Sequence, residues 1–155
     1  MKAISIKIET LADTEAFGRR LAGRLFPGAV VALIGPLGAG KTHLTRAIAE
    51  GLGVANVAVV NSPTFVLIQE YDARLPIYHF DAYRLRNEAE FTELGVHEYF
   101  QGKGVSVIEW ADKVPACLPT EHLEIRITIR GEESRRIDIT AYGARNEAVL
   151  RGLVV

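Results

Sequence analysis

The chain contains two kinds of strand pattern. Residues 29–34 and 105–108 are almost continuously apolar, which is typical of strands buried on both faces of a parallel sheet. Residues 4–8, 123–130 and 136–140 instead alternate apolar and polar side chains, which predicts strands with one buried face. We expect the first of these three to be an edge strand. The other two predict a hairpin that adds antiparallel strands to the sheet.

The first helix signal follows the N-terminal strand. Thr10 is a favourable N-cap, and Asp13 three residues later completes a weak capping box. Phe17, Leu21 and Leu25 then recur at helical spacing. We interpret this apolar stripe as part of the core and give it no functional role.

Further elements follow along the chain. Residues 43–50 have helical spacing and end at two glycines, Asn87 begins another helix, and 147–155 is apolar enough for a short final helix. A β-rich run at residues 57–60 predicts one short strand, and two more at residues 66–71 and 75–80 predict a hairpin. Strands and helices that alternate in this way indicate an α/β fold.

Length and charge narrow the class of protein. A chain of 155 residues predicts a single domain over residues 1–155. The net charge of -1 gives no general electrostatic attraction for nucleic acid or anionic membranes. The single cysteine, Cys117, excludes an intrachain disulfide, and no Cys/His grouping has zinc-site spacing. The N-terminus resembles neither a signal peptide nor a membrane span, so we expect a soluble, cytoplasmic protein.

The segment between residues 29–34 and 43–50 carries the strongest chemical signal. It fills the pattern G-x-x-x-x-G-K-[ST] with Gly35-Pro36-Leu37-Gly38-Ala39-Gly40-Lys41-Thr42. The glycines let backbone N–H groups and the helix N-terminus converge on a polyphosphate. Lys41 adds a positive charge for the β- and γ-phosphates, and the Thr42 hydroxyl can complete the shell of a magnesium ion. The alternative is a glycine-rich turn that only begins a helix, but the strand before and the helix after favour a phosphate loop.

Two carboxylates follow β-rich runs and are candidate partners of the phosphate loop. Glu109 follows residues 105–108, and a buried carboxylate is costly unless it is paired, so we interpret it as the acidic residue that works with the loop. Asp81 ends the run at 75–80, where it either holds a magnesium-bound water or only caps the next turn. Trp110 either covers the site or only seals the core, and packing in the core is the simpler interpretation.

Two further groups of side chains leave alternatives open. Ser62 and Thr64 follow the phosphate-loop helix where nucleotide-sensing loops contact a γ-phosphate or magnesium, but Pro63 equally fits an ordinary turn with exposed hydroxyls. Four arginines of the C-terminal hairpin form a local basic patch. These arginines are Arg126, Arg130, Arg135 and Arg136. They either reach a phosphate of a nucleotide or of RNA, or they simply face solvent.

Four blocks of sequence together closely resemble the TsaE (YjeE) family of small bacterial P-loop ATPases. They are the phosphate loop at 35–42, Ser62-Pro63-Thr64-Phe65, His79-Phe80-Asp81-Ala82-Tyr83-Arg84-Leu85 and Glu109-Trp110. The resemblance covers nearly the whole chain, and the last three blocks are more specific than the widely shared phosphate loop. The chain departs from the family at Pro36, where many members carry an acidic residue, and at His43, where Thr or Ser is common.

The resemblance implies a three-layer P-loop NTPase sandwich whose central, mainly parallel sheet is extended by antiparallel strands. It also implies a magnesium-dependent ATPase required for N6-threonylcarbamoyladenosine formation in tRNA, at the adenosine next to the anticodon. The group transfer itself belongs to the partner TsaD, which pairs with TsaB. The resemblance further implies that the TsaE-like subunit would dock on that pair and drive its turnover, so that tRNA would be reached only through the complex.

Roles for individual residues also come from the resemblance. Lys41, Asp81 and Glu109 would support hydrolysis, and Thr42 and Glu109 would hold magnesium. Residues 62–64 would form the nucleotide-sensing loop, and Trp110 would lie close enough to the site to report on it. The implied ATP-binding residues are Gly35, Leu37, Gly38, Ala39, Gly40, Lys41, Thr42, Thr64 and Trp110.

Two other functions stay open. A small-molecule kinase could use the same loop. It is disfavoured because the chain shows no arginine-rich lid to clamp the transferring phosphate, although Arg84 and Arg86 leave this alternative open. In a non-hydrolysing assembly switch, ATP would only order the loop around Thr64 for a partner. A GTPase is disfavoured because the chain lacks an Asn-Lys-x-Asp motif. Glu109 and Asp81 favour hydrolysis, but no water-positioning glutamine or arginine finger is visible, which predicts slow turnover until a partner completes the site.

Overall fold

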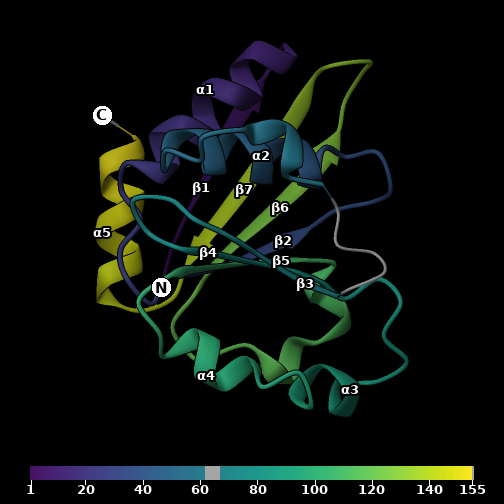
Figure 1. Ribbon diagram of the computed structural model, residues 1–155. Coiled ribbons are helices and arrows are strands. Elements are labelled where there is room, and N and C mark those ends of the chain that lie inside the picture. Colours follow the sequence, from purple (N-terminus) through teal and green to yellow (C-terminus); the bar gives the residue numbers. More distant parts are fainter. Residues whose placement is uncertain (62–66, 155) are drawn as a thin grey trace.

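The computed structural model describes residues 1–61 and 67–154. It contains a seven-stranded mixed sheet in the order β1-β7-β6-β2-β5-β4-β3 (Figure 1). Four neighbouring strands at its centre are mutually parallel, namely β6 (Leu123–Ile129), β2 (Val30–Ile34), β5 (Val105–Glu109) and β4 (Ile77–Asp81). Antiparallel pairing adds β7 (Arg135–Ala141) and then β1 (Lys2–Ile8) at one side, and β3 (Ile68–Tyr71) at the other. The predicted α/β fold with a mainly parallel centre is confirmed.

The strand pattern at the C-terminal end gave one wrong prediction. The alternation of polar and apolar residues predicts that both hairpin strands are antiparallel additions, but β6 runs parallel to β2 from Leu123 to Arg126. β7 then runs antiparallel to β6, as expected for a hairpin. Alternation reports that one face of a strand is buried, and it carries no information about the direction of the neighbouring strand.

Helices cover the sheet on two sides (Figure 1). α1 (Leu11–Ala22), α2 (Lys41–Gly51) and α5 (Ala144–Leu153) pack on one face, and the short helices α3 (Glu88–Thr92) and α4 (Val96–Phe100) lie on the other. Tight 3-10 turns complete the chain at Val57–Val59, Ala111–Lys113 and Pro115–Cys117. The predicted strand at 57–60 is therefore wrong. The Asn56 side chain accepts the N–H of Ala58 and so favours a turn at this point.

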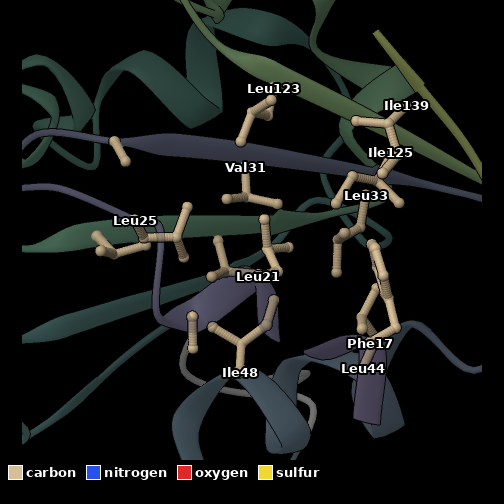
Figure 2. Packing of buried hydrophobic residues seen from close by; sticks show 14 of the residues in the cluster. Phe17, Leu21, Leu25, Val31, Leu33, Leu44, Ile48, Leu123, Ile125 and Ile139 are labelled. Carbon is tan, nitrogen blue, oxygen red and sulfur yellow. The ribbon is translucent and has the colours of Figure 1, made fainter. Parts of the chain in front are cut away.

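Two apolar clusters hold the layers together. In the larger one, Figure 2 shows side chains of α1 and α2 that point toward the sheet, including Phe17, Leu21, Leu44 and Ile48. They meet Val31 and Leu33 of β2, together with residues of β6. The second cluster packs Phe80 of β4 and Ile108 of β5 against residues of α3 and α4. β2 and β5 are consequently buried on both faces, as their apolar sequences predict.

The position of α2 is fixed by close packing against α1. The predicted capping box of Thr10 and Asp13 begins α1, and a Cβ added to Gly18 would lie only 2.5 Å from the Cβ of Ala47 on α2. Asn87 likewise caps α3, as predicted. Because the phosphate-loop segment leads directly into α2, this contact also fixes where that segment ends.

The strands β6, β7 and β1 bury only one of their faces. Their other face carries polar side chains, of which Ser5, Lys7, Arg126 and Arg136 are exposed. β1 is an edge strand with a half-buried pattern, as predicted. Within residues 1–61 and 67–154, none of the helices has the length and apolar composition needed to span a bilayer.

Candidate phosphate-binding site

The loop between β2 and α2 has a backbone that needs glycine. Gly38 and Gly40 have φ angles of 81° and 103°, a region that other residues rarely adopt. A Cβ on Gly35 would lie 2.9 Å from the carbonyl oxygen of Ile127 in β6. The glycines of the motif therefore serve the tight path of the loop, and its last residue leads into the N-terminus of α2 at Lys41.

Lys41 is buried inside this loop, with 5% of its surface exposed. Its Nζ donates hydrogen bonds to the carbonyls of Gly35 at 2.6 Å and Pro36 at 3.0 Å. Nζ also lies 3.8 Å from the centre of the Trp110 ring, a cation–π contact. Burial lowers the pKa of Lys41 below its ordinary value, and the nearby carboxylates, chiefly that of Glu109, oppose this shift.

Glu109 at the end of β5 faces the first turn of α2. The Thr42 hydroxyl lies within hydrogen-bond distance of both its carboxylate oxygens, at 2.9 and 3.1 Å. Only 2% of Glu109 is exposed, so these contacts form in a region of low dielectric constant. The sequence predicts that Glu109 works with the phosphate loop, and the structure places the two side by side.

His79 is a second buried partner of Glu109 that the sequence interpretation missed. Its Nε2 lies 2.5 Å from Glu109 Oε2, and its Nδ1 lies 3.3 Å from the Tyr71 hydroxyl, which is 2.5 Å from Gln69 Oε1. Neither His79 nor the carboxyl group is open to solvent. The available signal was a polar residue inside a β-rich run, two positions before Asp81 and therefore on the same face of β4.

Asp81 lies beside Glu109 because β4 and β5 are in register at this pair. Its Oδ1 accepts the N–H of Tyr83 at 2.8 Å, so it does cap the following turn. It also lines the cleft in front of the phosphate loop. The two interpretations of Asp81 that the sequence leaves open are therefore compatible.

Trp110 turns the chain at the end of β5. It has a φ angle of 58°, which is uncommon for a large side chain, and its ring lies over Lys41 and 4.9 Å from the Tyr83 ring. It also packs against the second apolar cluster. Trp110 thus both packs on the core and covers the buried lysine.

These residues surround one cleft of about 410 Å³. Its lining comes from the phosphate loop, α2 and the ends of β4 and β5, and consists of Leu37, Gly38, Gly40, Lys41, Thr42, His43, Asp81, Tyr83, Glu109 and Trp110. Gly35 and the buried Ala39 belong to the same loop, while Ser62 and Thr64 lie outside the described residues. His43 and Tyr83 are cleft residues to which the sequence gave no role. Of the four hairpin arginines, Arg135 contacts the phosphate loop, whereas Arg126, Arg130 and Arg136 are exposed.

The fold and the site define a P-loop protein. A buried parallel strand, a glycine loop and a helix follow one another, and the loop lysine and helix threonine face a carboxylate on the neighbouring strand. Comparison with known proteins places it more narrowly. Residues 8–137 match the family described as threonylcarbamoyl adenosine biosynthesis protein TsaE, and the chain belongs to this family.

Individual relatives agree with this assignment. The chain is 44% identical to the tRNA threonylcarbamoyladenosine biosynthesis protein TsaE of Bacillus subtilis, over 99% of this chain and 95% of the relative. It is 38% identical to the TsaE protein of Treponema pallidum, over 82% and 93% of the two chains. The crystal structure of Bacillus subtilis YdiB superposes with a TM-score of 0.85 at 39% identity, covering 99% of this chain and 95% of that one.

Proposed function

We propose that this protein is a magnesium-dependent ATPase that serves N6-threonylcarbamoyladenosine formation in tRNA, at the adenosine next to the anticodon. The observation that carries the proposal is the Thr42 hydroxyl held against Glu109, directly beside the buried Lys41. The family assignment and the names of the relatives support the link to threonylcarbamoyladenosine. The proposed compartment is the cytoplasm, and the whole described chain is proposed to act as one ATPase domain.

The side chains at the cleft suit magnesium. Thr42 and Glu109 offer a hydroxyl and a carboxylate within 3.1 Å of each other, which are the hard oxygen ligands that magnesium prefers. Within the part of the chain that the structure describes, no group of three or more His, Cys, Asp or Glu could hold a metal by itself. This is consistent with magnesium, which takes most of its ligands from water and nucleotide phosphates. Bound there, magnesium would neutralise charge on the β- and γ-phosphates.

The remaining residues have separate tasks in the proposed reaction. The loop N–H groups and Lys41 bind phosphate oxygens, and a phosphate is a stronger acceptor than the two carbonyls that Lys41 contacts here. Asp81 is placed beside Glu109, from where it can orient the attacking water. His79 holds the Glu109 carboxylate in position toward Thr42. Trp110 covers one side of the lysine and reduces its contact with water.

The mouth of the cleft supports a partner-dependent enzyme. Leu37 and Tyr83 line it and are 79% and 46% exposed, so that a leucine and an aromatic ring at the cleft are open to contact with a partner. We propose that the TsaB–TsaD pair docks over this mouth and completes the site. Turnover is then slow for the isolated protein, and tRNA is reached through the complex.

The test is magnesium-dependent ATP hydrolysis by the purified protein, alone and with TsaB and TsaD from the same organism, with and without tRNA. Stimulation by the partners is the expected result. Hydrolysis that the partners do not change would contradict the proposed role, and phosphorylation of an added small molecule would establish the kinase alternative. ATP-dependent binding to the partners without any phosphate release would establish the assembly switch.

A further inference from the structure

Arg135, the first residue of β7, contacts the phosphate loop and the β6–β7 turn together. Its Nε donates to the carbonyl of Ala39 at 2.9 Å, and its Nη2 donates to that of Gly38 at 3.3 Å. Its Nη1 donates to the carbonyls of Gly131 at 3.0 Å and Ser134 at 2.8 Å. One side chain therefore joins the β6–β7 turn to the phosphate loop, and Arg135 lies 96 residues from Ala39 in the sequence.

These bonds determine which way the loop amides point. The described chain has no cis peptide bonds, and in a trans peptide the C=O and N–H groups point to opposite sides. Because the carbonyl of Ala39 faces Arg135, the N–H of Gly40 points away from Arg135. The preceding peptide is fixed in the same way, since Gly38 O also faces the guanidinium and the Ala39 N–H donates to Pro36 O at 3.0 Å.

Arg135 acts from outside the cleft. Gly40 lines the cleft together with Lys41 and Thr42, whereas Arg135 lines a separate hollow of about 430 Å³ beside β1 and the β6–β7 turn. Gly40 is the N-cap of α2 in a left-handed conformation, and as a glycine it has no side chain that could cap the helix. Glycine has the largest conformational freedom of any residue, so a loop of this kind depends on contacts from elsewhere to stay in one conformation.

We infer that Arg135 is a positioning residue of the phosphate site. It turns the carbonyls of Gly38 and Ala39 outward, so that the Gly40 N–H is presented to the cleft before a ligand arrives. The entropic cost of ordering the loop then falls on folding, so it does not reduce the free energy of ligand binding. The planar guanidinium bonds the loop through Nε and Nη2 and the turn through Nη1, whereas a lysine ammonium has all its donors on one nitrogen. The inference rests on the proposed function, because it assumes that the cleft binds phosphates.

The experiment compares Arg135→Ala and Arg135→Lys with the wild type. Arg136→Ala is the matched control, because Arg136 is the next residue of β7 but is exposed and bonds Asp138 at 3.1 Å. The dissociation constants of pyrophosphate and ADP are measured by calorimetry. We expect Arg135→Ala to weaken both ligands by the same factor of about ten, which corresponds to about 1.4 kcal/mol. Arg135→Lys is expected to fall between Arg135→Ala and the wild type, and Arg136→Ala to match the wild type.

Two results of the binding experiment would overturn the inference alone. Weaker ADP binding with unchanged pyrophosphate binding would place Arg135 on the nucleoside, and unchanged binding of both would leave it without a role. If wild type binds neither ligand, the proposed function itself fails, whereas the first two results remove only the inference. Should Arg135→Ala not fold, amide hydrogen exchange at Ala39 in Arg135→Lys decides, because the Ala39 N–H donates to Pro36 O within the loop. Faster exchange than in wild type supports the inference, and unchanged exchange overturns it.

Discussion

The two halves of the sheet differ in how they are covered and in what their strand ends carry. β2 and β5 are buried on both faces, and the cleft lies at the ends of β4 and β5 with Asp81 and Glu109. β6, β7 and β1 bury one face, and their charged residues, such as Lys7 and Arg136, lie in solvent. Charged groups of the first half interact in a medium of low dielectric constant, whereas those of the second half are screened by water.

This difference shows where charge is expected to matter. Lys41, His79 and Glu109 are nearly inaccessible to water. His79 and Glu109 are hydrogen-bond partners, and the Glu109 carboxylate opposes the lowering of the Lys41 pKa by burial. We call the solvent-exposed side of β6, β7 and β1 the half-covered face. Its charges can be changed at little cost in stability, since exposed ion pairs contribute about 0–1 kcal/mol. Arg135 is the exception, because it belongs to the half-covered strands but reaches back to the phosphate loop.

The largest effect is expected at the buried charges of the cleft. Lys41→Ala and Glu109→Ala should each abolish ATP turnover, a loss of at least about a thousandfold, because both remove groups proposed to bind phosphate or magnesium. Hydrolysis is measured beside a urea unfolding curve, since both variants should remain folded, although Glu109→Ala should lose stability because it leaves His79 without its partner. Lys103→Ala and Glu98→Ala are the controls, because both residues are exposed. Wild-type turnover in both cleft variants would disprove the site assignment.

A large effect on stability is expected at His79. Loss of one member of a buried pair leaves the other without its partner, so His79→Ala should lower the free energy of unfolding by about 3–5 kcal/mol. Exposed His97 provides the control, and His97→Ala should be close to neutral. If His79 also positions Glu109, the magnesium concentration that half-saturates ATP turnover should rise in His79→Gln. An unchanged magnesium dependence would limit His79 to a structural role.

A smaller difference in stability is expected between substitutions in the two halves of the sheet. Leu33 of β2 is fully buried, so Leu33→Ala should cost about 2–5 kcal/mol of unfolding free energy. Thr128 of β6 points to the half-covered face, where Thr128→Ala should change stability by no more than about 0.5 kcal/mol. Denaturant unfolding of the two variants is the measurement. Similar losses in both would mean that the face of β6, β7 and β1 is covered in solution.

The smallest effect is expected at Asp138 on the half-covered face. Hydrogen bonding by the Ser5 hydroxyl, followed by that of Arg136, lowers the pKa of the Asp138 carboxyl below its usual range. A lowered folded-state pKa stabilises the protein above the unfolded value, and this contribution disappears as the pH falls through the folded-state pKa. Asp138→Asn should therefore cost about 0.5 kcal/mol near neutral pH and nothing in strong acid. Unfolding curves at the two pH values test this, and an equal cost at both would contradict it.

The sequence predicted most of the fold because its signals are local. A capping box at Thr10, glycines at 38 and 40, and a run of apolar residues in β2 each act within a few residues of themselves. The wrong strand at 57–60 has a local cause as well, since the Asn56 side chain favours a turn over the β-branched residues that follow it. The nucleotide-sensing role of Thr64 stays a prediction, because Thr64 lies outside the described residues.

By itself, the sequence identified the glycine loop motif, its lysine and threonine, and two carboxylates that follow β-rich runs. Only the tertiary structure decided the parallel pairing of β6 with β2, the contact of His79 with Glu109, and that of Arg135 with the loop. The reason is physical. The two side-chain contacts join residues that lie 30 and 96 positions apart, and a periodic pattern reports whether a side chain is buried but not which distant group it meets.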